Sequence, residues 1–83
     1  MKQTKDIMTI VGNNVKRYRE EAGFTQSHLG GCFGATSNRI KMIEGGMADF
    51  KLSTLAKLAE YLDVKVIDLV EDWEDYDDES QRN

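Results

Sequence analysis

The chain has 83 residues, 40% of them hydrophobic and 31% charged, with one cysteine, one histidine and no proline. This length fits one small domain, a single cysteine excludes an internal disulfide, and one cysteine with one histidine offers too few ligands for the usual zinc sites, so we expect no cofactor. The formal net charge of -4 disfavours a nucleic-acid partner for the chain as a whole, and the lack of a run of ~20 apolar residues or a signal peptide predicts a cytoplasmic protein without a membrane partner.

The first predicted helix extends from about residue 6 to residue 22, and Gly23 then ends it as a C-cap. Its apolar residues recur at spacings of three and four, which places them on one stripe of the helix. The stripe consists of Ile7, Val11, Val15, Tyr18 and Ala22.

The second predicted helix follows Thr25, whose hydroxyl makes a good N-cap. Leu29 and Phe33 face inward from it, four residues apart, and Gly34 ends it. Only the turn Gly34-Ala35-Thr36 separates this helix from the next one.

The third predicted helix runs from Ser37 to about Glu44, with Thr36 as its N-cap, and two glycines end it. Ile40 and Ile43 face inward. Gly30 of the preceding helix lies where the two helices cross, and a small residue there allows close packing. Two short helices joined in this way are typical of a helix-turn-helix.

The remaining pattern predicts a fourth helix capped by Ser53 and a short fifth helix, with Asp63 between them. No segment alternates as a strand does, so the predicted fold class is all-α, with five short helices. The apolar residues of these two helices are Leu55, Leu58, Ala59 and Leu62 in the fourth, and Val66, Ile67, Leu69 and Val70 in the fifth.

The sequence resembles the Cro and phage-repressor type (XRE-like) helix-turn-helix family over about residues 11–69. The resemblance implies a compact five-helix, lambda-repressor-like DNA-binding domain and a role in transcription regulation. The matching positions are Val11-Gly12, Arg19, Gly23-Phe24-Thr25-Gln26, Leu29, Gly34, Ile40, Ile43-Glu44, Gly46 and the run from Leu55 to Val64.

Helical geometry identifies the side of the third helix that is free to meet DNA. At about 100° per residue, Asn38 and Met42 lie opposite the inward face, and Ser37, Arg39 and Lys41 lie on its flanks. Asn pairs with adenine and Met offers an apolar contact for a thymine methyl. We therefore expect base contacts from Asn38 and Met42, with Ser37 and Lys41 as further candidates, and a phosphate contact from Arg39.

Other candidate residues lie outside this helix. The resemblance implies that Gln26, in the first turn of the second helix, holds a DNA phosphate; the alternative is that it supports the helix cap. Lys51 is a further phosphate candidate. In the family, residues at the places of Arg19 and Glu44 form a structural ion pair that ties the recognition helix to the scaffold.

The acidity of the chain is concentrated at its C-terminus. Residues 71–83 contain seven acidic residues and one arginine, 1 − 7 = −6, whereas the other 70 residues contain ten basic and eight acidic residues, 10 − 8 = +2. We therefore expect a helix-turn-helix domain over residues 1–72 and an acidic, disordered tail over residues 73–83.

The leading functional hypothesis is a sequence-specific regulator of transcription, a repressor or autoregulator, that binds double-stranded DNA through the major groove. A homodimer on a two-fold operator would place two recognition helices about 34 Å apart. Its interface is expected at Ile67, Leu69, Val70 and Trp73, because one short helix does not need so many apolar residues for its own packing.

The alternative is an antitoxin or adaptor that binds a protein partner through the fifth helix and the acidic tail. An enzyme is not expected, because the sequence offers no set of catalytic side chains.

Overall fold

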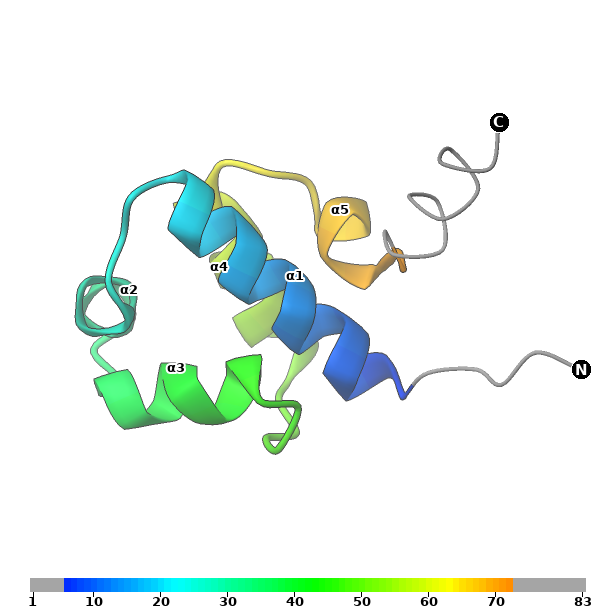
Figure 1. Ribbon diagram of the computed structural model, residues 1–83, viewed down its shortest axis with the longest axis horizontal. Helices are drawn as coiled ribbons and strands as arrows, with labels where there is room; N and C mark the ends of the chain where they lie inside the picture. Colours follow the sequence, from blue (N-terminus) through cyan, green and yellow to red (C-terminus); the bar gives the residue numbers. More distant parts are fainter. Residues whose placement is uncertain (1–5, 73–83) are drawn as a thin grey trace, which may run out of the picture.

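A computed structural model describes residues 6–72, which form five α-helices and no strand (Figure 1). The all-α prediction is confirmed. The helices are α1 (Ile7–Glu21), α2 (Gln26–Cys32), α3 (Ser37–Glu44), α4 (Leu52–Leu62) and α5 (Val66–Val70).

The long helix α1 crosses the middle of the molecule and contacts α3, α4 and α5, while α2 packs on α3 (Figure 1). Side chains from all five helices meet in one apolar core. Its fully buried members are Val11, Val15, Leu29, Ile40, Ile43, Leu58 and Leu69.

The predicted stripe of α1 is correct in its middle and wrong at both ends. Val11 and Val15 are buried, but the Ile7 side chain is 53% exposed and Ala22 is exposed. Ile7 lies in the first turn and Ala22 is the C-cap, so both lie at the ends of the helix, where the neighbouring helices cover it less.

Threonine hydroxyls cap α2 and α3, as predicted. Thr25 Oγ1 accepts a hydrogen bond from the backbone N–H of His28 at 2.9 Å, and Thr36 Oγ1 accepts one from that of Arg39 at 3.2 Å. These bonds satisfy N–H groups that have no partner within a helix.

The predicted cap of α4 is wrong. The helix begins at Leu52 and its N-cap is Lys51, which makes no side-chain cap hydrogen bond. Ser53 is already the second helical residue, because the extended backbone ends at Lys51, so its hydroxyl does not stand at the cap position. At the other end, Asp63 closes α4 in the left-handed conformation, with φ of 60°.

A buried asparagine joins the end of α5 to α1. The side-chain amide of Asn14 donates hydrogen bonds to the carbonyl oxygens of Leu69 at 2.9 Å and Glu71 at 2.8 Å. These two carbonyls lie at and beyond the C-terminus of a five-residue helix, where backbone acceptors lack intrahelical partners. The amide therefore fixes the chain as it leaves α5.

The predicted acidic tail over residues 73–83 lies outside the described residues. Within residues 6–72, no helix is long and apolar enough to span a membrane, and no three His, Cys, Asp or Glu residues are grouped so that they could hold a metal ion.

Candidate functional site

The two helices of the predicted helix-turn-helix approach each other closely at Gly30. A Cβ atom built on Gly30 would lie 2.8 Å from the carbonyl oxygen of Thr36, nearer than real Cβ atoms come. The backbone N–H of Ala35 also donates to the carbonyl oxygen of Gly30 at 2.8 Å. The geometry explains why the sequence has its smallest residue here, since any side chain would force the turn and α2 apart.

The exposed face of α3 is formed by the residues that helical geometry places opposite the core. Ile40 and Ile43 are fully buried, whereas Asn38 is exposed and Met42 is 38% exposed. The side-chain amide of Asn38 lies 3.8 Å from the sulfur of Met42, so the two side chains form one continuous surface one helical turn apart. This surface offers an amide and an apolar thioether together.

Basic residues flank this surface. Lys41 is exposed and Arg39 is half-buried, and Ser37 is exposed at the start of the helix. The one acidic residue of α3, Glu44, is buried and faces α1. The outward side of α3 therefore carries positive and neutral groups.

Arg19 of α1 and Glu44 at the end of α3 form a buried ion pair. The Nε of Arg19 donates to one carboxylate oxygen of Glu44 at 2.6 Å, and its Nη2 donates to the other at 3.1 Å. Each residue is only 8% exposed. The remaining terminal nitrogen, Nη1, donates to the carbonyl oxygen of Phe24 at 2.7 Å. The arginine thus connects three elements: its own helix, the loop before α2 and the end of α3.

The electrostatics of this pair favour the charged arginine. The hydrogen bond that Arg19 donates to Glu44 raises the pKa of Arg19, against the opposing effect of burial. The guanidinium stays charged throughout the physiological range.

Gln26 joins the ion pair instead of the helix cap. Its side-chain amide donates to the carboxylate of Glu44 at 3.1 Å, while Thr25 makes the cap hydrogen bond. Gln26 is half-buried and lies in the first turn of α2. The structure therefore connects a residue at the start of α2 to the last residue of α3. Lys51, the other candidate phosphate contact, is exposed after the loop that follows α3.

The structure separates the four residues predicted for a dimer interface. Leu69 is fully buried in the core, so this prediction is wrong: its side chain contacts its own chain and is not available to a second copy. Val70 is half-buried against the same core, whereas Ile67 is 56% exposed. Trp73 lies outside the described residues.

The local sequence pattern predicts neither the role of Asn14 nor the contact between Gln26 and Glu44. Nothing in the local pattern marks Asn14 as the residue that holds the end of α5, because its partners are backbone carbonyls 55 and 57 residues away. The hydrogen bond from Gln26 to Glu44 likewise spans two helices. A polar residue on the inward side of an apolar stripe was the available signal for Asn14.

No family model and no curated protein matches the chain, but several solved structures do. A hypothetical transcription factor, NHTF from Neisseria, is 19% identical and superposes with a TM-score of 0.79 over 92% of this chain and 90% of that one. The master regulator for biofilm formation SinR, solved in complex with DNA, is 29% identical with a TM-score of 0.67, over 74% of this chain and 98% of its own.

The same fold also occurs inside a larger protein. Hydroxypropylphosphonic acid epoxidase from S. wedmorenis matches 82% of this chain at 23% identity and a TM-score of 0.77, but only 36% of its own length is covered. The likenesses below 25% identity establish the fold, and the regulators among the matches are covered over most of their length.

Proposed function

We propose that this chain, a helix-turn-helix protein with the fold of the Cro and phage-repressor type (XRE-like) regulators, is a sequence-specific transcription regulator that inserts α3 into the major groove of double-stranded DNA. The observation that carries the proposal is the exposed face of α3, where Asn38 and Met42 lie side by side above buried Ile40 and Ile43. A rigid helix that presents an amide and an apolar group, flanked by cations, suits base-edge recognition.

Within this proposal the residues have separate roles. Asn38 and Met42 contact bases, with Ser37 and Lys41 beside them, because all four are exposed on one face of α3. Arg39, Lys51 and Gln26 hold phosphates, which fix the register of the helix without carrying sequence information. The hydrogen bond from Gln26 to Glu44 is compatible with this role, because it holds the side chain next to the end of α3 and uses only one of the two N–H donors of the amide.

Arg19 and Glu44 act on DNA binding indirectly. Their ion pair joins α1 to α3 and leaves neither side chain free for a phosphate. The ion pair fixes the angle of α3 relative to α1.

The regulator acts as a homodimer, with two copies of α3 about 34 Å apart on a two-fold operator. Ile67 supports an interface on α5, because a 56% exposed isoleucine has little contact with its own core. Sedimentation should show a dimer, and Ile67→Ser should weaken it. A monomer at micromolar concentration, both free and on DNA, would contradict the dimer while leaving DNA recognition by one copy intact.

Selection of binding sites from random DNA tests the main proposal. The wild-type protein, Asn38→Ala and Lys41→Ala are compared at two salt concentrations, with Lys57→Ala on the exposed side of α4 as the control for loss of a charge. Loss of preference at one base position, worth about 1–3 kcal/mol, is expected for Asn38→Ala, and no change of preference for the control.

The outcomes separate the two functional classes. Uniform weakening by Asn38→Ala would make this residue a phosphate contact. Selection of no motif, together with binding that does not depend on salt, would refute the regulator and favour a protein-binding antitoxin or adaptor.

A further inference from the structure

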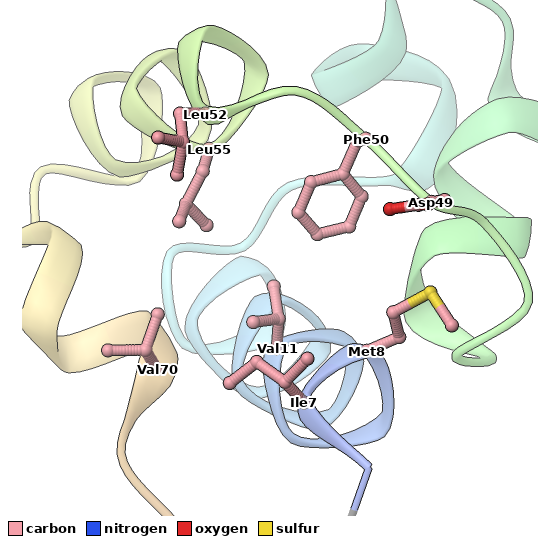
Figure 2. Close-up of a pocket in the computed structure, with 8 residues that line it drawn as sticks. All are labelled: Ile7, Met8, Val11, Asp49, Phe50, Leu52, Leu55 and Val70. Carbon is pink, nitrogen blue, oxygen red and sulfur yellow. The ribbon is translucent and has the colours of Figure 1, made fainter.

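An apolar pocket of about 240 Å³ opens between the start of α1, the loop before α4 and the end of α5 (Figure 2). Figure 2 shows side chains from these elements arranged around an open centre, with the Asp49 carboxylate as the charged group of the lining. The apolar lining includes Ile7, Val11, Phe50, Leu52, Leu55 and Val70.

The rim of the pocket contains apolar surface that the described chain leaves uncovered. Leu52 is 82% exposed and Ile7 is 53% exposed, although both line the pocket. Two large aliphatic side chains beside an apolar hollow make a surface that gains stability when an apolar group covers it.

We propose that the side chain of Trp73, from the C-terminal segment of the same copy of the chain, occupies this pocket. The described chain ends at Asp72, and Val70, which lines the pocket, lies three residues before Trp73. Three residues span at most about 10 Å, so Trp73 is held within reach of the pocket. Asn14 strengthens this restriction, because it fixes the carbonyl oxygen of Glu71 beside α1 at 2.8 Å.

The size of the pocket fits the indole ring. An apolar cavity of about 150 Å³ accepts a benzene ring, and this pocket, at about 240 Å³, has room for the larger bicyclic ring of an indole. Trp73 is the one tryptophan of the chain, and its segment contains no other large apolar side chain except Tyr76. The pocket and the segment are therefore matched in chemistry as well as in distance.

Tryptophan fluorescence tests the proposal in the full chain, since Trp73 is the one tryptophan. The reference for an unprotected indole is a synthetic peptide of residues 73–83. We expect the full chain to emit at shorter wavelength than the peptide and to be quenched several-fold less by acrylamide, at every protein concentration.

A matched pair of variants locates the indole. Ile7→Asp adds a carboxylate at the rim of the pocket, and Ile67→Asp makes the same change at a residue of equal exposure, 53% against 56%, on a part of α5 that does not line the pocket. Both residues lie in the first turn of a helix, where an aspartate is tolerated, and circular dichroism checks that both variants fold. Ile7→Asp should restore peptide-like quenching, whereas Ile67→Asp should not.

Three results would overturn the proposal. Quenching of the wild-type protein equal to that of the peptide would show that the indole has no docking site. Protection that survives Ile7→Asp would place the indole elsewhere. Protection that grows with protein concentration, in step with dimer formation, and is lost in Ile67→Asp would assign the pocket to a second copy of the chain.

Discussion

Removal of one partner of the buried ion pair should destabilise the fold far more than removal of both. Arg19→Met leaves the carboxylate of Glu44, whose side chain is 4% exposed, with the amide of Gln26 as its one hydrogen-bond partner among residues 6–72. An uncompensated buried charge costs about 3–5 kcal/mol. Domains of this size have unfolding free energies of only about 4–12 kcal/mol, so the variant should lose much of its stability.

The double variant Arg19→Met/Glu44→Met removes both charges and replaces them with flexible apolar side chains. It leaves the carbonyl oxygen of Phe24 without the donor that Arg19 supplied at 2.7 Å, which costs about 1–3 kcal/mol. The double variant should therefore be more stable than either single variant. The coupling energy of the cycle should be about 2 kcal/mol or more.

A neighbouring contact of the same arginine provides the control. Arg19 Nη2 lies 3.9 Å from the carboxylate of Glu20, whose side chain is 58% exposed. Because water screens this pair, Glu20→Gln should change the unfolding free energy by no more than about 1 kcal/mol. Urea unfolding, followed by circular dichroism, measures all four variants under the same conditions.

Two results would refute this reasoning. Costs that simply add in the double variant would show that Arg19 and Glu44 do not stabilise the fold as a pair. Normal thermal stability of Arg19→Ala combined with lost DNA binding would show that the arginine acts on DNA directly and not through the position of α3.

Three further predictions concern the backbone and the tail. Gly12→Ala places a Cβ 2.8 Å from the carbonyl oxygen of Glu44 and should lower the unfolding free energy by about 1–3 kcal/mol. Gly31→Ala, whose Cβ would have nothing within 4 Å, should raise the unfolding free energy by about 0.5–1 kcal/mol. Equal effects of the two variants on the melting temperature would contradict the close approach of α1 and α3. Asp63→Gly should raise the unfolding free energy by up to about 1 kcal/mol, because glycine adopts the left-handed conformation, with φ of 60°, without the steric strain of a Cβ. A loss of stability in thermal unfolding would mean that the aspartate side chain stabilises this turn. Removal of residues from Asp75 onward should strengthen nonspecific DNA binding more at low salt than at high salt, because carboxylates near DNA repel phosphate, and unchanged affinity in a gel-shift titration would place the tail away from the DNA.

The amino-acid sequence by itself determined the five helices and the starts of α2 and α3. The threonines before α2 and α3 act through N–H groups three residues away, and the spacing of Ile40 and Ile43 selects the buried side of α3 without reference to any other element. These interactions are local, so the order of residues is sufficient to predict them.

The tertiary structure determined which of several apolar residues in the same helix are buried in the core. Four of the five residues of α5 are apolar, and no period in so short a helix distinguishes Leu69, which is fully buried, from Ile67, which is 56% exposed. Packing of α5 against α1 determines which residue is buried, and the Asn14 amide of α1 binds the carbonyl oxygens of Leu69 and Glu71.

The pocket and the partners of Gln26 have the same origin. Gln26 reaches Glu44 because α2 packs on α3, and the pocket exists because α1, α4 and α5 do not close completely around Val11. Contacts between residues far apart in the chain depend on how helices pack in three dimensions, which helical periodicity does not encode.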